Sequence, residues 1–308
     1  MRAMGRPVWF DGQLVPLEAA NLSVMGHAAH RGSLVFDFGA FHATPRGGAT
    51  FRMREHLARF RRSAAFLGLV IEQDERTLAE ATRQTVAASG LAEGYVRWSA
   101  LVTSIEPDLV PRDSRAHVAI FAYTPRDLLP AGALPAPKRE VLRIAVFDDA
   151  RKAPPEVFPP LAKVAGAYAG PLIAKRRALA AGADEVVLLD IDGNIAEAPT
   201  ANVFAVVGGA LVTPPLGRIL DGITRDSVLT IARAEGLEVH ERTLSLAELA
   251  AADEAFLTAS SFPIAPIASI NGAPLRRAVP GEVTSHLREI LLDAERGGEA
   301  RFARWTEG

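Results

Sequence analysis

The chain contains no cysteine in its 308 residues. This absence excludes disulfide bonds, thiolate catalysis and metal sites built on cysteine. Long apolar runs are also missing, because no segment reaches the roughly 18 uninterrupted apolar residues that a membrane-spanning helix needs. The N-terminal stretch MRAMGRPVWFDGQLVP has no apolar signal core either. We therefore expect a soluble, cytoplasmic protein without a membrane partner.

A strong excess of charge of either sign is lacking as well. The formal net charge is -2, and 49% of the residues are hydrophobic and 23% charged. This is a globular composition without the basic surface that binds nucleic acid or an anionic membrane. The length exceeds that of a usual single core and favours two domains. We expect small neutral or zwitterionic molecules as partners, and no nucleic acid.

Strand-like and helix-like patterns alternate through the first half of the chain. Asp11-Gly12 lies between two short apolar runs and predicts a hairpin. Helical spacing of apolar residues predicts one helix that stops before Gly68 and a second, over 74–89, that stops at Gly90. The stretch YVRWSALVT alternates and predicts a strand with Tyr95, Arg97 and Ser99 on one face and Val96, Trp98 and Ala100 on the other.

The second half begins after a segment rich in proline. Residues 124–137 contain four prolines and can continue neither a helix nor a strand, so they predict an interdomain linker. Beyond it we expect hairpins around Asp192-Gly193 and within NVFAVVGGALVTP, a helix with Thr224 as its N-cap, and a charged, peripheral helix after about residue 285. The predicted fold class is α+β, with a small N-terminal domain over 1–123 and a large C-terminal domain over 138–308.

Lysine is scarce. Among 34 lysines and arginines, the lysines are only Lys138, Lys152, Lys163 and Lys175. Lys163 lies in LAKVAGAY among small apolar residues, whereas Lys152 and Lys175 have the polar surroundings of solvated charges. A desolvated lysine can become an amine nucleophile, which an arginine cannot. The alternative for Lys163 is a side chain at a strand end that reaches solvent.

A tyrosine and a carboxylate follow Lys163 in the sequence. Tyr168 stands five residues later, and Glu197 lies between Ala196 and Ala198 on a predicted short strand. A carboxylate at such a place is ordinarily exposed. A buried one needs a cationic partner, and a protonated pyridine nitrogen would serve.

Three further stretches are suited to binding an anion. In LDGITRDSV a helix starts just after Gly222, in TASS small hydroxyl residues follow an apolar strand, and in FRMREH Arg52 and Arg54 alternate on an extended segment. Helix starts and arginines bind phosphate well. Each stretch also has an ordinary interpretation, because most helix starts bind nothing, small polar residues form turns, and arginines are usually solvated.

A lysine amine, a tyrosine hydroxyl, a lone carboxylate and an anion site are together what pyridoxal phosphate requires. The chain resembles the fold-type IV pyridoxal-phosphate enzymes, the class-IV aminotransferases, which include branched-chain aminotransferases, D-amino-acid and (R)-amine transaminases and aminodeoxychorismate lyase. The resemblance covers nearly the whole chain. It is carried by the order of VWFDGQLVP, MGHAAHRGSLVFDF, FRMREHLARF, LAKVAGAY, AEAPTANVF, LDGITRDSV and DEAFLTASS.

The resemblance implies a role for each matching residue. Lys163 is the implied Schiff-base lysine, Tyr168 the group beside the cofactor's 3-oxygen, and Glu197 the partner of the ring nitrogen. The implied phosphate-binding residues are Arg54, Gly222, Ile223, Thr224 and Ser260. The resemblance also implies a two-domain fold with the cofactor between the domains, and a homodimer whose partner contributes to each substrate pocket. The implied reaction is a ping-pong transfer of an amino group between an amino acid and a 2-oxo acid.

The motifs of the chain are most similar to those of the branched-chain aminotransferases, so a branched-chain amino acid is the expected donor. The implied substrate-binding residues are Arg31, Phe36, Tyr95, Arg97, Ser260 and Ser261. Arg31 stands where that branch typically has tyrosine, and Phe36-Asp37-Phe38 replaces Phe-Glu-Gly. An arginine inside the pocket would favour a substrate carboxylate, whereas an arginine at the rim would be solvated. D-amino-acid and (R)-amine transamination, and aminodeoxychorismate lyase activity, remain alternatives.

Other classes of protein have less support. His27 and His30 are three residues apart, but no third ligand stands nearby, so packing or capping is favoured and no metal is expected. No Gly-x-Ser-x-Gly motif indicates a hydrolase. A non-catalytic binding protein fits the composition, yet it does not account for Lys163, Glu197 and Arg54 in the order of the family.

Overall fold

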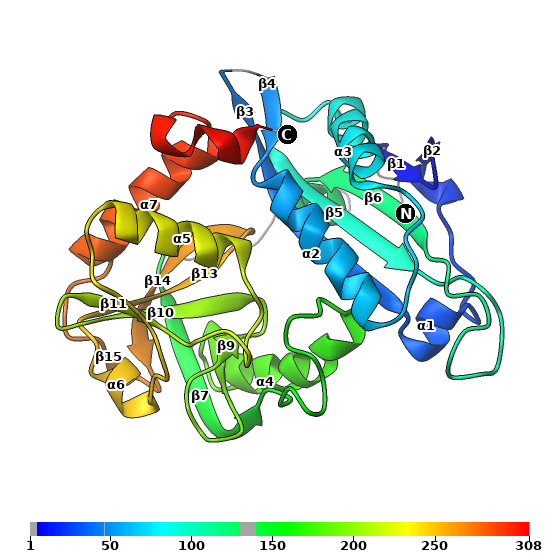
Figure 1. Cartoon of the computed structure of the whole chain (residues 1–308). Coiled ribbons are helices and arrows are strands. Elements are labelled where there is room, and N and C mark those ends of the chain that lie inside the picture. Colours follow the sequence, from blue (N-terminus) through cyan, green and yellow to red (C-terminus); the bar gives the residue numbers. More distant parts are fainter. Residues whose placement is uncertain (1–4, 46, 130–139, 308) are drawn as a thin grey trace. The chain divides into compact units, whose positions relative to one another are not determined.

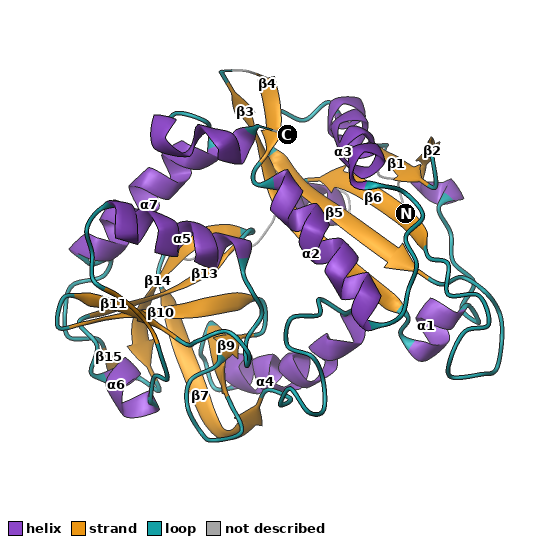
Figure 2. Ribbon diagram, viewed as in Figure 1, coloured by secondary structure: helices purple, strands orange, loops and turns teal. Residues whose placement is uncertain are grey.

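The computed structural model describes residues 5–45, 47–129 and 140–307. Residues 130–137 of the predicted linker lie outside these ranges. Contacts between residues divide the chain into two compact units: unit 1 is Met1–Pro137, Ala162–Gly166 and Ala294–Gly308, and unit 2 is Lys138–Leu161 and Ala167–Asp293. Each unit combines a β-sheet with helices, which confirms the α+β class (Figure 1; Figure 2).

Unit 1 is built on a six-stranded antiparallel sheet with the strand order β2-β1-β6-β5-β3-β4. The strands are β1 (Pro7–Phe10), β2 (Gln13–Pro16), β3 (Leu34–Thr44), β4 (Gly47–Thr50), β5 (Gly94–Leu101) and β6 (His117–Tyr123). The helices are α1 (His27–Arg31), α2 (Met53–Phe66) and α3 (Glu75–Ser89), with 3-10 turns at Leu17–Ala19, Pro125–Leu128 and Ala300–Thr306. Asp11 and Gly12 have positive φ angles of 44° and 100°, as a tight hairpin turn requires, so the first predicted hairpin is confirmed.

Helices α2 and α3 begin and end close to the predicted positions. Asp74 caps α3 by accepting a hydrogen bond from the Thr77 N–H at 2.8 Å. Gly90 ends α3 in the left-handed conformation with a φ of 68°, and Gly68, after α2, has a φ of 66°. Local capping residues therefore determine both ends of α3 and the end of α2.

The two faces of the unit 1 sheet differ in what covers them. Trp98 is fully buried, and its indole N–H donates to Thr82 of α3 at 2.8 Å. Asp37, on the same face, contacts Arg59 of α2. The predicted alternation along β5 is confirmed, because Val96, Trp98 and Ala100 are buried beneath these helices while Tyr95, Arg97 and Ser99 are half-buried on the opposite face.

Unit 2 contains a nine-stranded sheet in which β12-β11-β10-β13-β14-β7-β8 follow one another, β9 pairs with β10, and β15 pairs with β14. The strands are β7 (Leu142–Arg151), β8 (Glu185–Leu189), β9 (Glu197–Ala198), β10 (Ala201–Val207), β11 (Ala210–Thr213), β12 (Val239–Glu241), β13 (Glu254–Ala259), β14 (Phe262–Ile270) and β15 (Ala273–Pro274). The helices are α4 (Ala169–Ala180), α5 (Ile223–Ala234), α6 (Leu246–Ala250) and α7 (Glu282–Glu295), and a 3-10 turn spans Ala165–Tyr168. Its core includes Ile144, Val187, Val203 and Leu257.

Three local predictions for the second half need correction. Helix α5 begins at Ile223 with Gly222 as its N-cap, so the assignment of Thr224 as the N-cap was wrong; the Thr224 side chain is buried instead. The hairpin around Asp192-Gly193 is joined by a single bridge, because its second side forms β9 and pairs with β10. Helix α7 starts at Glu282 and buries Leu287 and Leu291, so it is not merely peripheral.

No helix in the described part of the chain has both the length and the apolar character needed to cross a membrane.

One buried carboxylate makes the stability of unit 1 depend on pH. Glu295 is only 2% exposed, and its carboxylate lies 3.6 Å from the His42 ring. Burial raises the pKa of Glu295 to about 8, which Arg296 only partly opposes. Between the unfolded pKa, near 4.5, and pH 8, the folded state therefore binds more protons than the unfolded state. The free energy of unfolding falls as the pH rises through this window.

We expect Glu295→Gln to flatten this dependence, because glutamine has no proton to lose. At pH 8 the free energy of unfolding of the variant is expected to exceed that of the wild type by on the order of a few kcal/mol. At about pH 4.5 the difference should be close to zero. Urea unfolding at pH values of about 5, 6.5 and 8 measures the effect. Equal pH slopes for the two proteins would contradict the assignment.

Candidate active site

The segment that carries Lys163 belongs to unit 1 and is fixed through its backbone. The Lys163 N–H donates to the Ser63 hydroxyl at 3.0 Å, and the Lys163 carbonyl accepts from the Phe36 N–H at 3.0 Å. Val164 forms an isolated bridge with Val35 of β3. The Lys163 side chain is half-buried, with its amine 4.9 Å from the centre of the Phe36 ring. The amine is therefore positioned over an aromatic surface.

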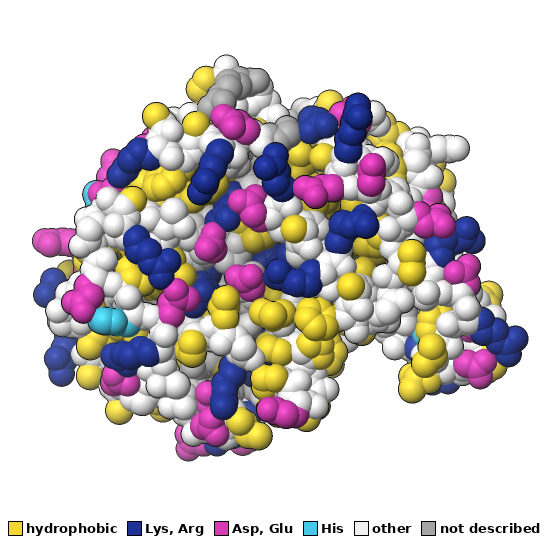
Figure 3. Space-filling view, viewed as in Figure 1, with side chains coloured by type: hydrophobic (Ala, Val, Ile, Leu, Met, Phe, Trp, Pro, Cys, Tyr) yellow, Lys and Arg dark blue, Asp and Glu magenta, His cyan; other side chains and the backbone are white. Residues whose placement is uncertain are grey.

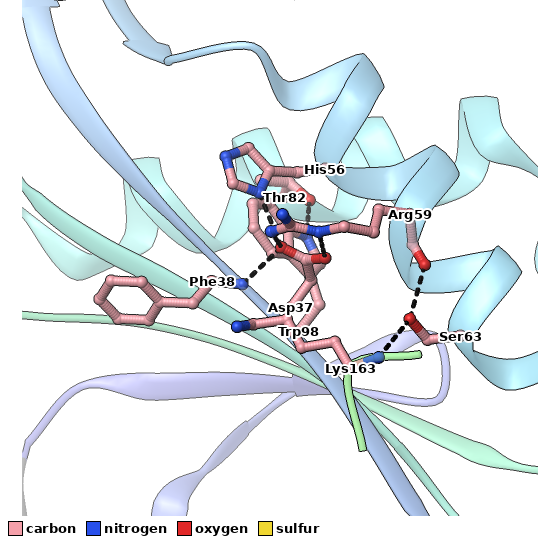
Figure 4. Close-up of polar contacts among 8 residues, drawn as sticks. All are labelled: Asp37, Phe38, His56, Arg59, Ser63, Thr82, Trp98 and Lys163. Atoms are coloured by element: carbon pink, nitrogen blue, oxygen red, sulfur yellow. Dashed lines mark hydrogen bonds and ion pairs between the residues drawn. The ribbon is translucent and has the colours of Figure 1, made fainter. Parts of the chain in front are cut away.

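Asp37 and Arg59 form a buried ion pair near the Lys163 segment (Figure 4). Asp37 is fully buried and accepts two hydrogen bonds of 2.8 Å from Arg59, with the His56 ring 2.7 Å away. Burial would raise the pKa of Asp37, but Arg59 and His56 outweigh it and the pKa is lowered. Burial lowers the pKa of His56, which Asp37 only partly offsets. The ion pair therefore consists of anionic Asp37 and cationic Arg59.

This ion pair is connected to Lys163 through helix α2. The Ser63 hydroxyl donates to the Arg59 carbonyl at 2.9 Å and accepts from the Lys163 N–H (Figure 4). Ser63 thus bridges one turn of α2 to the lysine backbone. Sequence reasoning missed Ser63, Arg59 and His56, and only their helical spacing in the REHLARFRRS stretch relates them to one another.

Three of the predicted substrate residues lie on the sheet face opposite α2 and α3. The Arg97 guanidinium stacks over the Phe36 ring at 4.0 Å, so two cationic side chains, Arg97 and Lys163, share that ring. Tyr95 lies on the same face and contacts Phe38. Two cations at one place attract an anion such as a substrate carboxylate.

Arg31 is the last residue of α1. It is exposed, and its guanidinium donates to the Pro107 carbonyl at 2.9 Å. His27, at the start of the same helix, is buried and contacts the Ser33 hydroxyl at 2.7 Å, which is a packing role. Among the described residues, no three His, Cys, Asp or Glu side chains are grouped as metal ligands.

The two arginines of FRMREH lie at the start of helix α2, not on the extended segment expected from sequence, and they have different environments. Arg52 is the N-cap of α2 with a φ of 51°; it is buried, ion-paired with Glu55 at 2.9 Å, and lies over the Trp305 ring. Arg54 is exposed in the first turn of α2. It lines a pocket of about 330 Å³ together with Arg52, Met53, Glu55, Arg304 and Glu307.

Glu197 of unit 2 is a buried carboxylate with partners from its own chain. It is 8% exposed and accepts hydrogen bonds from the Asn202 amide at 3.1 Å and the Leu220 N–H at 3.0 Å. Its other oxygen pairs with the Lys152 ammonium. Lys152 is therefore not the solvated charge expected from sequence. The scarcity of lysine was the one signal that could have drawn attention to it.

Asn202 connects Glu197 with the start of α5. Its amide also donates to the Leu220 carbonyl at 3.1 Å, and a Cβ at Gly222 would collide with its oxygen. Helix α5 therefore requires glycine at its N-cap and has no capping side chain there. Across the strands from Asn202, the buried Thr258 hydroxyl has no hydrogen-bond partner in the described structure.

The remaining predicted residues occupy turns of unit 2. Ser260 and Ser261 form the two-residue connection between β13 and β14 and are half-buried. Tyr168 is half-buried at the end of a 3-10 turn and directly precedes α4. All three therefore lie directly beside regular elements.

Comparisons with known proteins identify the family of the chain. Residues 35–270 match the family described as Amino-transferase class IV. The chain is 30% identical over 298 residues to the branched-chain-amino-acid aminotransferase of Pseudomonas aeruginosa, covering 97% of this chain and 95% of the relative. For the Escherichia coli K12 enzyme of the same name the identity is 32% over 287 residues, covering 92% and 91%.

Solved structures give the same result. The Thermoproteus uzoniensis branched-chain aminotransferase with norvaline has a TM-score of 0.89 and 31% identity, covering 97% of this chain and 98% of that one. The Thermobaculum terrenum branched-chain aminotransferase in its PLP form has a TM-score of 0.88 and 27% identity, covering 98% and 97%. The chain belongs to the class IV aminotransferases and has their fold-type IV architecture. It is a transaminase.

Proposed function

We propose that this transaminase uses pyridoxal 5'-phosphate to move an amino group between a branched-chain amino acid and a 2-oxo acid in a ping-pong cycle. The observation that carries the proposal is the Lys163 amine held over Phe36, with the Arg97 guanidinium on the same ring. The names of the relatives, the PLP form of one solved structure and the norvaline bound to another support it.

The residues of unit 2 fit the proposed cofactor. Glu197 is a buried carboxylate suited to a ring nitrogen, and α5 starts without a capping side chain, as an anion site requires. The Thr258 hydroxyl is a buried group that lacks a partner in the described structure. We assign phosphate binding to Arg54, Gly222, Ile223, Thr224 and Ser260, and contact with the 3-oxygen to Tyr168. When bound, the cofactor supplies an aldehyde and an electron-withdrawing ring.

The chain's own residues then have defined tasks. The Lys163 amine would take the proton from the substrate Cα and pass it to the cofactor carbon beside the amino group, and in the second half of the cycle it would carry a proton from that carbon to the Cα of the oxo acid. Arg97 and Tyr95 bind the substrate carboxylate, while Phe36 provides an apolar floor that excludes water. Glu197 is paired with Lys152, which places a positive charge beside this carboxylate. These tasks require no other acid or base at the Cα.

A panel of amino donors tests the proposal. L-leucine, L-isoleucine and L-valine should each react with 2-oxoglutarate, at rates well above those of D-amino acids and (R)-amines. A preference for D-amino acids or (R)-amines would replace the branched-chain assignment. If Arg31 contacts the substrate, Arg31→Tyr should lower kcat/KM most for dicarboxylate substrates. Unchanged relative kcat/KM values across the panel would show that Arg31 is a surface residue without a role in binding. A colourless protein without turnover would favour a binding protein.

Cofactor retention tests Arg54 separately. We expect Arg54→Ala to weaken cofactor affinity by roughly tenfold to a hundredfold, because a charge-assisted phosphate contact contributes about 1.5–3 kcal/mol of mostly uniform binding. The chemical step at saturating cofactor should change little. Arg83→Ala, on the exposed side of α3, is the matched control. Unchanged affinity with collapsed turnover would reassign Arg54 to the substrate.

We also propose a homodimer. Five apolar side chains just before α1 and in the loop after β5 are between 53% and 84% exposed: Val24, Met25, Ile105, Leu109 and Val110. Backbone hydrogen bonds from His27 to Ser104 and from Ala28 to Val102 join the helix to that loop, so these residues belong to one surface (Figure 3, lower right). A second copy of the chain would cover this surface.

Analytical ultracentrifugation tests this proposal. The wild type should sediment as a dimer, and Leu109→Glu should dissociate it into monomers. The cytoplasmic location stays a prediction.

A further inference from the structure

Phe38 stands beside the reacting lysine on the open face of the unit 1 sheet. Successive residues of β3 point to opposite faces, so Asp37 faces α2 while Phe36 and Phe38 face the other way. Phe36 lies beneath the Lys163 amine. Phe38 is the next side chain along the same face, about 7 Å farther on. Figure 4 shows the Phe38 ring and the Lys163 side chain both extending to the left, away from Ser63 and α2.

Neighbouring rings hold Phe38 in place. Its ring centre lies 5.0 Å from that of Tyr95 and 6.4 Å from that of Tyr123, and the two tyrosines are 6.3 Å apart. Ring pairs at these distances stabilise one another by about 0.5–1.5 kcal/mol each. The three rings therefore form a stiff cluster. Phe38 is half-buried, so part of its ring remains on the open face.

The position of Arg97 determines which part of a bound substrate lies near the cluster of Phe38, Tyr95 and Tyr123. Phe38 is directly opposite Arg97 in the β3–β5 register, while the guanidinium leans over Phe36 toward the Lys163 amine. For a substrate whose carboxylate binds Arg97 and whose Cα lies at Lys163, the Phe38 ring is the next apolar group along this face that the substrate side chain can meet.

We propose that Phe38 is a specificity-determining residue that closes one end of the substrate pocket and restricts it to short aliphatic side chains. This inference rests on the proposed function and narrows its substrate class to donors the size of valine or norvaline. A pocket of fixed size discriminates against one extra methylene by roughly tenfold to two-hundredfold. Larger groups such as the leucine or phenylalanine side chain should therefore react more slowly than valine.

Substitution of Phe38 tests the inference through a ratio. Phe38→Ala should raise kcat/KM for phenylalanine relative to valine by at least about tenfold, and Phe38→Leu by less. Phe10→Ala removes an aromatic ring of the same sheet, stacked on His117 at 5.9 Å, that lies on β1, three strands from β3; its ratio should equal that of the wild type. A ratio unchanged within about twofold in both Phe38 variants would overturn the proposal.

A binding measurement keeps this test separate from the test of transamination. Calorimetry compares 4-methylvalerate, a ligand of one solved branched-chain aminotransferase, with the bulkier 3-phenylpropanoate. Phe38→Ala should bind 3-phenylpropanoate at least about tenfold more tightly than the wild type does, with 4-methylvalerate changed less. Failure of the wild type to turn over any amino donor would refute the proposed function. Normal turnover with unchanged selectivity and unchanged binding would refute only the role of Phe38.

Discussion

Replacing Lys163 with alanine is expected to reduce transamination by on the order of a thousandfold or more while the fold stays intact. The fold is preserved because the backbone of the segment, not the side chain, makes the hydrogen bonds to Ser63 and Phe36. The other described lysines cannot substitute. Lys152 is paired with Glu197, and Lys175 with Glu185 at 2.6 Å.

Borohydride reduction measures this prediction directly. In the wild type, reduction should bleach the yellow protein and attach the cofactor irreversibly to the chain. The Lys163→Ala protein should release all cofactor on denaturation, whereas Lys175→Arg, the matched control, should behave as the wild type. A borohydride-fixed cofactor in Lys163→Ala would refute the assignment of Lys163.

Glu197→Gln is expected to keep the cofactor bound but to slow each half-reaction by on the order of a hundredfold or more, because a neutral amide cannot hold a ring nitrogen protonated. The electron-withdrawing power of the ring is then lost. The substitution also removes the anion paired with the half-buried Lys152 ammonium, which lowers the free energy of unfolding. A drop in melting temperature should therefore accompany the loss of rate.

Single-turnover rates with valine, together with the cofactor absorbance, separate the two effects. Glu197→Asp keeps the charge and should recover part of both rate and stability. Lys152→Met should lower stability as Glu197→Gln does but retain more of the rate, because the carboxylate remains. Near-normal deamination by Glu197→Gln would return Glu197 to a purely structural role.

The sequence by itself determined the elements whose causes are local. Alternation predicted the two faces of β5, and Asp11-Gly12 and Gly90 marked a hairpin and a helix end because these residues tolerate positive φ. Lys163 and Glu197 were singled out for the same kind of reason, a charged residue among small apolar neighbours. The order of the motifs then indicated the family, which the family match confirmed.

Only the tertiary structure decided which charged groups are buried and what they pair with. Nothing next to Lys152 or Arg52 in sequence marks its partner, yet Lys152 pairs with Glu197 and Arg52 packs on Trp305, far along the chain. The assignment of residues 162–166 to unit 1 likewise follows from bonds to β3 and α2. A buried charge is stable only beside a compensating partner, and long-range packing, which no local pattern encodes, supplies that partner.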